Sequence, residues 1–176
     1  MDALKAIHTR RSVRQFTSEL VSERDIEEIL NAGRLAPSGS NIQAWTFIVV
    51  DDLKVIDLVK MFSPGLFTAT PLIIAVCSDL RKYEESGGLV GKEYLRIADC
   101  AMAVENMLLT AHAINLGACP IRSFSPIALK VILELPGGVE PELLVIVGNP
   151  VNQPKTPPKV QLKHIAYRNT YGTVWK

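Results

Sequence analysis

The stretch from Tyr94 to Asn115 is the longest helical pattern in the chain, and it is apolar on nearly every face. A surface helix of a globular domain carries one apolar stripe, so a helix that is apolar nearly all round needs cover on several sides. We therefore expect a central helix against which the rest of the chain packs. Its apolar positions are Ile97, Ala98, Ala101, Met102, Val104, Met107, Leu108, Leu109 and Ala111.

Short apolar runs supply the strands that such a helix would cover. Trp45–Val50, Pro71–Cys77 and Leu143–Val147 are typical of buried strands, and Ala118–Phe124 is a shorter extended piece. Further helical patterns lie at residues 2–8, from Ser22 onward, at 53–61 and at 126–133. We expect one α+β domain over residues 1–176, with helices layered on a sheet.

Composition excludes several classes of protein. Hydrophobic residues make up 48% of the chain and the net charge is +1, so neither nucleic acid nor an anionic membrane is expected as a partner. The three cysteines form no C-x-x-C pair and the histidines lack metal-ligand spacing, which disfavours a disulfide framework and a metal site. The N-terminus lacks a signal-peptide core and no apolar run is long enough to span a bilayer, so we expect a cytoplasmic protein.

Two common kinds of site are also missing from the sequence. It contains neither G-x-G-x-x-G nor G-x-x-x-x-G-K-[ST], which disfavours a Rossmann or P-loop nucleotide site. It has no G-x-S-x-G motif, and its histidines have no obvious nucleophile partner.

Residues 9–16 (TRRSVRQF) bring three arginines and a serine close together in the chain. Crowding Arg10, Arg11 and Arg14 is unfavourable unless an anion neutralises them, and the planar guanidinium fork suits a phosphate group. The hydroxyl of Ser12 could add a hydrogen bond. The segment predicts a phosphate site, with a solvated basic surface as the alternative.

The stretch from Leu35 to Thr46 is a polar connection between a helix and a buried strand. Pro37 fixes its own φ, and Gly39 permits backbone conformations that a side chain would hinder. The polar groups that it offers to a ligand are those of Ser38, Asn41 and Gln43. This loop is a candidate binding wall, with an ordinary helix–strand connection as the alternative.

A second polar stretch, residues 81–91 (RKYEESGGLVG), is the most glycine-rich internal segment. Polar residues and glycines of this kind are typical of exposed connections. We expect a surface loop here, with a mobile lid as the alternative.

Four segments, in this order, resemble the nitroreductase family of flavin mononucleotide (FMN)-dependent oxidoreductases. They are Arg10–Phe16 (RRSVRQF), Ala36–Trp45 (APSGSNIQAW), Ala98–Leu109 (ADCAMAVENMLL) and Leu116–Phe124 (LGACPIRSF). The resemblance extends over almost the full length of the chain. It implies a nitroreductase-like α+β fold, with a mainly antiparallel sheet of about four to five strands flanked by helices and a C-terminal tail that extends to a partner subunit.

The same resemblance implies which residues would contact FMN. Arg10, Arg11 and Ser12 would hold the phosphate and ribityl chain. Arg14 would lie beside N1 and O2 of the isoalloxazine, where a cation favours the reduced, negatively charged flavin. The ring edge and ribityl hydroxyls would be met by Pro37, Ser38, Gly39, Asn41 and Gln43. The backbone N–H groups of residues 122 and 123 would lie near N5 and O4.

Two positions depart from the family pattern. Arg122 and Ser123 stand where the family often has Glu-Gly, so a positive side chain would either favour an anionic substrate near the reacting edge or point to solvent. Lys159 and Val160 stand where the family has a basic pair for the phosphate. One cation is therefore missing there, and Lys159 remains.

The implied reaction is ping-pong hydride transfer from NADH or NADPH, through flavin N5, to an electron-poor acceptor such as a nitroaromatic or a quinone. Its implied assembly is a homodimer with FMN at the interface, for which the aromatic tail (Tyr167, Tyr171, Trp175) offers contact surface; the alternative is a tail packed on its own subunit. Cys119 lies near this site but is expected to be a buried structural thiol.

Two other functions fit the same sequence. The first is a flavin-binding or flavin-processing protein of the same fold with little NAD(P)H turnover. The second is a non-enzymatic binding domain that has lost the cofactor.

Overall fold

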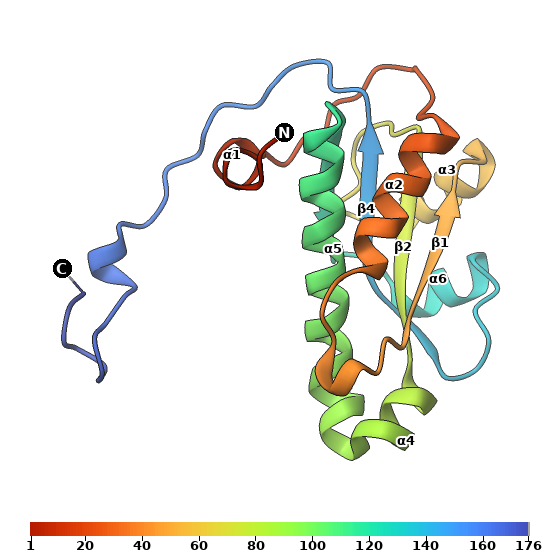
Figure 1. Cartoon of the computed structure of the whole chain (residues 1–176). Coiled ribbons are helices and arrows are strands. Elements are labelled where there is room, and N and C mark those ends of the chain that lie inside the picture. The colour runs from red at the N-terminus through yellow and green to blue at the C-terminus, as the bar shows by residue number, and fades with distance from the viewer. Residues whose placement is uncertain (176) are drawn as a thin grey trace.

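A four-stranded sheet forms the middle of the molecule in the computed structural model, which describes residues 1–175 (Figure 1). The strands are β1 (Trp45–Val50), β2 (Leu72–Asp79), β3 (Gly117–Ile121) and β4 (Val139–Gly148). They lie in the order β1-β2-β4-β3, and each neighbouring pair is antiparallel. The predicted α+β class and mainly antiparallel sheet are confirmed.

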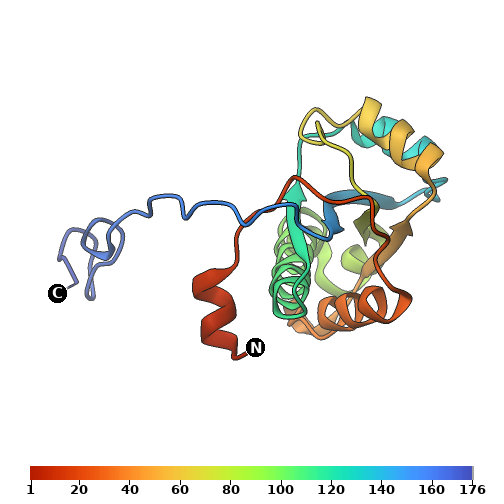
Figure 2. The ribbon, with the colours of Figure 1, turned by 90° about the horizontal axis from the view of Figure 1, so that it is seen from above.

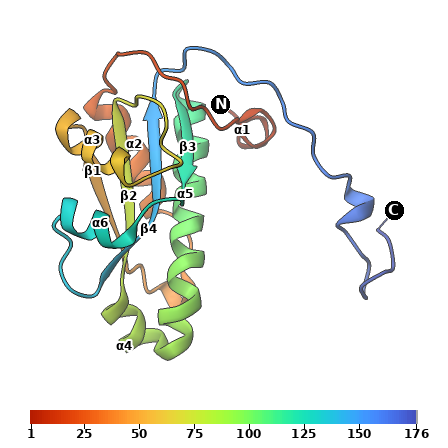
Figure 3. The same cartoon turned by 180° about the vertical axis from the view of Figure 1, so that it is seen from behind.

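Helices cover both faces of this sheet and give the domain three layers (Figure 2). They are α1 (Ala3–Thr9), α2 (Glu23–Arg34), α3 (Leu53–Met61), α4 (Leu80–Val90), α5 (Arg96–Ala113) and α6 (Pro126–Ile132), with shorter helical turns at Gly39–Asn41, Gly91–Leu95 and Leu162–His164. α2 and α5 pack on one face, and α3 and α6 pack on the other (Figure 3). Because successive side chains of β2 join opposite cores, this strand is apolar without interruption from Leu72 to Cys77.

The long helix α5 is central, as predicted, but the chain covers it on one side only. Cys100, Val104 and Met107 are buried against the sheet and α2. On the other side, the exposed apolar residues are Ile97, Ala98, Ala101 and Met102. Because α5 is apolar on nearly every face, one apolar stripe of this helix is left uncovered by the rest of residues 1–175.

The prediction of a surface loop at residues 81–91 is wrong, because most of this segment forms helix α4. The side chain of Asp79 caps the helix by accepting a hydrogen bond from the backbone N–H of Arg81 at 3.0 Å. Gly88, with φ 57°, introduces a kink within the helix. The glycines that favoured a loop instead bend a helix.

One strand differs from expectation in extent. β4 begins at Val139 rather than Leu143, and its polar start hides a buried carboxyl: Glu142 accepts a hydrogen bond from Ser78 at 2.6 Å. The first helix is as expected, with Asp2 accepting from the N–H of Lys5 at 3.2 Å.

The two ends of the chain lie outside the three-layer body. α1 stands beside it, and the chain beyond residue 152, here called the C-terminal tail (153–175), runs away from it (Figures 1 and 2). The start of the tail touches the arginine segment, where Arg11 donates to Thr156, but the aromatic end with Tyr167, Tyr171 and Trp175 is not packed on the body of its own chain. Within residues 1–175, no helix is long and apolar enough to cross a bilayer.

Candidate functional site

The arginine-rich segment runs along the free edge of β3. The backbone N–H of Val13 donates to the carbonyl oxygen of Ala118 at 3.0 Å, and Ser12 and Ala118 form a parallel bridge. Val13 is buried against Gly117, where a Cβ atom would lie 2.7 Å from the Val13 side chain. The absence of a side chain at Gly117 is what lets this segment lie so close to the sheet.

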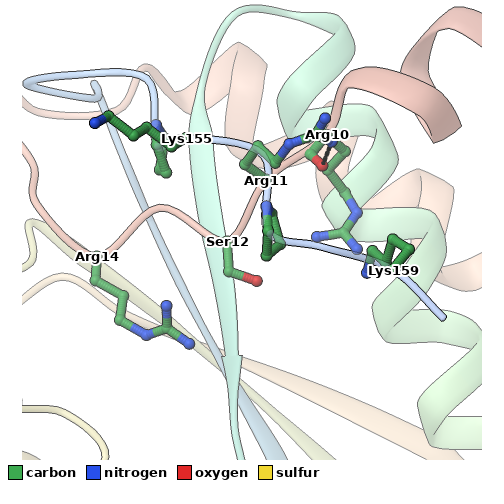
Figure 4. Close-up of a pocket in the computed structure, with 8 residues that line it drawn as sticks. Arg10, Arg11, Ser12, Arg14, Lys155 and Lys159 are labelled. Atoms are coloured by element: carbon green, nitrogen blue, oxygen red, sulfur yellow. Dashed lines mark hydrogen bonds between the residues drawn. The ribbon is translucent and has the colours of Figure 1, made fainter.

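The segment and the C-terminal tail together form a pocket of about 340 Å³, here called the phosphate pocket (Figure 4). Its lining residues are Arg10, Arg11, Ser12, Arg14, Pro154, Lys155, Pro157 and Lys159. All four predicted residues of the segment thus meet the predicted Lys159, although they are far apart in the sequence. Lys155 was not predicted.

Positive charge in this pocket is largely uncompensated. It has five cationic side chains, and among residues 1–175 the carboxylate that pairs with one of them is Glu105, at 3.5 Å from Arg10 Nε. Arg11 is held in place by donating to the carbonyl oxygen of His8 at 3.0 Å and to Thr156 Oγ1 at 2.8 Å. A cluster of this kind suits a doubly charged anion such as a phosphate.

The nearby histidine responds to the same charge. His112 Nε2 lies 2.8 Å from Thr9 Oγ1. Burial lowers the pKa of His112, and the positive charges of Arg10 and Arg11 lower it further. The imidazole therefore resists becoming a further cation beside the pocket.

The predicted binding wall forms a compact loop at residues 38–43, here called the ring-edge loop. Gly39 does not adopt the positive φ expected of it; Ser40, Asn41 and Gln43 do, at 50°, 57° and 51°. The constraint on Gly39 is one of space instead, because a Cβ atom there would lie 2.8 Å from Leu95 Cδ1 and the leucine side chain would have to move. Left-handed backbone at three residues with side chains is uncommon, and such strain is concentrated at functional loops.

The structure does not bring the ring-edge loop to the phosphate pocket of the same chain. The loop leads into Trp45, which is level with Ser78, whereas Ser12 lies beside Ala118, level with Leu72. These positions are at opposite edges of the sheet, about 14 Å apart across the strands and about 20 Å apart along them. The contacts predicted in the arginine segment and those predicted in the loop are therefore separate in one chain, and the loop group is Pro37, Ser38, Gly39, Asn41 and Gln43.

Arg122 and Ser123 form a third place, just after β3. The guanidinium of Arg122 lies 5.1 Å from the ring centroid of Phe124 and the residue is exposed. Ser123 lines a separate pocket of about 470 Å³ together with Met61, Phe62, Pro64, Phe124 and Ser125. Neither residue lines the phosphate pocket.

The cysteine near the site is a buried thiol, as expected. Burial raises the pKa of Cys119, against the lowering effects of Arg14, Ser12 and Arg10. A thiol that resists ionisation has little nucleophilic character.

One buried residue beside the ring-edge loop was missed. Asp99 of α5 accepts a hydrogen bond from the backbone N–H of Gly39 at 3.0 Å and another from the hydroxyl of Tyr83 at 3.0 Å. Its signal in the sequence is a lone acid among the apolar residues of the long helix.

Comparison with known proteins gives consistent results. A family model described as the nitroreductase family matches residues 7–69 and 58–149. A protein of Archaeoglobus fulgidus, provisionally named NADH dehydrogenase/NAD(P)H nitroreductase, is 35% identical over 161 residues, which are 86% of this chain and 87% of that protein. FMN reductase (NADPH) of Bacillus subtilis is 24% identical over 187 residues, covering 97% of this chain and 75% of that protein. A crystal structure from Parabacteroides distasonis, with the same provisional name as the first relative, has a TM-score of 0.84 at 27% identity and covers 96% of this chain and 98% of its own.

Proposed function

The chain belongs to the nitroreductase family and is an FMN-dependent NAD(P)H oxidoreductase, and we propose that its acceptors are electron-poor small molecules such as nitroaromatics or quinones. When bound, FMN supplies the redox chemistry, taking a hydride from NADH or NADPH and passing it to the acceptor in a ping-pong cycle. The protein supplies binding, orientation and charge. No acid–base dyad or nucleophile is required of it.

The observation that carries this proposal is the phosphate pocket, in which five cationic side chains surround one opening. Arg10, Arg11, Ser12 and Lys159 would hold the FMN phosphate and the start of the ribityl chain. Lys155, on the same stretch of tail, would supply the cation that the family pattern places at Val160. The fixed guanidinium of Arg11 supports this role, because its side chain is already oriented by backbone and hydroxyl oxygens.

Arg14 lines this pocket and also lines a neighbouring hollow of about 290 Å³ with Phe67 and Thr68. It would place positive charge beside the N1–O2 edge of the ring, where negative charge develops on reduction. The ring-edge loop and the backbone N–H groups of Arg122 and Ser123 would meet the remaining polar edges of the cofactor.

The separation of these groups in one chain supports a homodimer in which the ring-edge loop of one subunit completes the site of the other. Two further features support it. The exposed stripe of α5 (Ile97, Ala98, Ala101, Met102) offers an apolar face, and the C-terminal tail leaves its large apolar residues uncovered. A closed two-fold arrangement would give both copies the same completed site.

An absorption spectrum of the purified protein, followed by anaerobic reduction with each nicotinamide, tests the proposed function. We expect a flavin spectrum that NADH or NADPH bleaches rapidly and that an added quinone restores. A bound flavin that neither nicotinamide reduces would instead favour a flavin-processing protein. A colourless protein that does not take up added FMN would favour a binding domain without the cofactor.

A further inference from the structure

The ring-edge loop needs an anchor, because its backbone is held in an uncommon conformation. Ser40, Asn41 and Gln43 all have positive φ. Within the loop, the backbone N–H of Gln43 donates to Ser38 Oγ at 3.1 Å. A bond of this kind shapes the loop but does not fix its position relative to the sheet and helices.

Asp99 supplies that external connection. Its Oδ1 atom accepts from the backbone N–H of Gly39, and its Oδ2 atom accepts from the hydroxyl of Tyr83 on α4, both at 3.0 Å. Asp99 is 1% exposed and Tyr83 is fully buried. Burial, followed by the hydrogen bond to Asp99, raises the pKa of Tyr83, which keeps its hydroxyl protonated and able to donate.

The position is a costly one for an acid. Among residues 1–175 no cation forms an ion pair with Asp99, and the nearby Arg96 pairs with Glu142 instead. Desolvating a carboxyl group is unfavourable, and an apolar residue would continue the surrounding pattern of α5 at lower cost. What the acid gains at this position is its two hydrogen bonds, to the loop and to α4.

We propose that Asp99 is a positioning residue for the flavin site, which sets the place of the ring-edge loop through Gly39 and joins that loop to α4 through Tyr83. This inference rests on the proposed function, because the loop is what presents Ser38, Asn41 and Gln43 to the cofactor. Asp99 contacts the backbone of the loop and acts through it. Its effect belongs to the ring and ribityl part of FMN, since the phosphate pocket is built from other elements.

Flavin titrations of the full-length protein, stripped of cofactor, test this assignment. We compare FMN with riboflavin, which lacks the phosphate, by fluorescence quenching. Asp99→Ala should weaken both ligands by about the same factor, about tenfold, because it removes hydrogen bonds that position the shared part. Arg11→Ala should weaken FMN by a clearly larger factor than riboflavin, because riboflavin lacks the phosphate that this guanidinium would hold. General destabilisation of Asp99→Ala would also weaken both flavins alike, so the flavin comparison is read together with the protection of the Gly39 amide, which Asp99 holds directly.

A conservative variant supplies the matched control. In Asp99→Asn the amide oxygen can still accept from Gly39 and the amide nitrogen can donate to Tyr83, so both affinities should stay within about twofold of wild type. Hydrogen exchange gives a readout that needs no flavin: the Gly39 amide should exchange faster in Asp99→Ala, while amides in the middle of α5 stay protected.

The outcomes separate this inference from the proposed function. If wild type binds both flavins and Asp99→Ala binds them equally well, the role of Asp99 is refuted and the function stands. If the wild-type protein binds neither flavin, both the role of Asp99 and the proposed function are refuted. Should Asp99→Ala fail to fold, Tyr83→Phe removes the Oδ2 partner alone; it should weaken both flavins by about threefold, and unchanged affinities would refute the connection to α4.

Discussion

Arg14 differs from the other arginines of its segment in having no fixed partner for its side chain. Arg10 pairs with Glu105 and Arg11 donates to three oxygen atoms, whereas among residues 1–175 no carboxylate lies within ion-pair distance of Arg14. Its own backbone oxygen accepts from Thr68, which fixes the main chain and leaves the guanidinium free to meet a ligand.

Replacing Arg14 by alanine should therefore weaken FMN binding by about tenfold and slow anaerobic reduction by the nicotinamide, because a charge-assisted contact is lost. Titration and stopped-flow absorbance at the flavin band measure the two effects. Arg14→Lys is the matched control, since it keeps the charge and should retain most of the reduction rate. Unchanged affinity and rate in the alanine variant would contradict the assigned role.

The three cysteines should be inert in the folded protein. Cys77, Cys100 and Cys119 are all buried. Burial raises the pKa of each thiol, to about 12 for Cys77, so the thiolate fraction at pH 8 is very small in the native state. We expect a thiol reagent at pH 8 to modify fewer than one thiol per folded chain and all three in denaturant. Fast labelling of the native protein would show that the core opens readily.

Charged site residues that are close together in the sequence could be predicted, whereas those whose partners are distant in the sequence could not. Arg10, Arg11 and Arg14 stand together in the chain, so their shared purpose is visible before folding. Lys155 becomes a candidate phosphate contact only in the folded chain, where the tail lines the same pocket. Asp99 interrupts an apolar pattern, but its partners come from α4 and from the loop, and no local rule connects them.

The contact between the arginine segment and β3 depends on Gly117. A Cβ atom at this position would lie 2.7 Å from the Val13 side chain, which is buried and so has little space to move away. Gly117→Ala should force the segment away from the strand, lowering the free energy of unfolding by about 1–3 kcal/mol. Because Ser12 and Arg14 flank Val13, FMN affinity should fall as well.

Gly137 offers a matched control for this substitution. Nothing lies within 4 Å of a Cβ atom there, and its φ is not positive. Gly137→Ala should change the free energy of unfolding by less than about 1 kcal/mol and leave flavin binding unchanged. Urea denaturation of both variants measures the difference. Equal stability of the two would mean that the segment yields at no cost.

Elements with a strong internal pattern were predicted well, and those decided by single contacts were not. β2 is an unbroken apolar run from Leu72 to Cys77 because both of its faces are buried there, and α5 is recognisable by its length. The sequence predicts a loop in place of α4 because glycines and polar residues obscure the helical period there. The cap that starts this helix is a single side chain, that of Asp79, and gives only a weak signal in the sequence. The start of β4 is not predicted because Glu140, Pro141 and Glu142 are poor strand formers. Glu140 and Pro141 pair with β2, and Glu142, at a register shift, is held by its hydrogen bond from Ser78.

For the whole molecule, the two halves of the proposed site lie at opposite edges and ends of one sheet, so a single copy cannot close both around one cofactor. The exposure of the C-terminal tail also favours a second copy of the chain. Leu162, Ile165 and Tyr171 are exposed by 66%, 61% and 90%, and a free tail of this composition would gain free energy by covering a partner. The sequence could suggest such a surface, but no pattern along one chain shows which residues meet across two copies of it.

The double substitution Leu162→Asp and Ile165→Asp tests that arrangement. If the tail packs on a second copy, two charges would be buried in an apolar contact, so light scattering should show monomers and the flavin should be lost on gel filtration. Folding of the three-layer body should persist, because both side chains are exposed in the single chain.

Ile127→Asp on α6 is the control: Ile127 is 78% exposed and lies outside the tail, so this variant should stay dimeric and yellow. A double variant that keeps its mass and its flavin would place the dimer contact elsewhere, and a wild-type monomer that retains FMN would refute the shared site altogether.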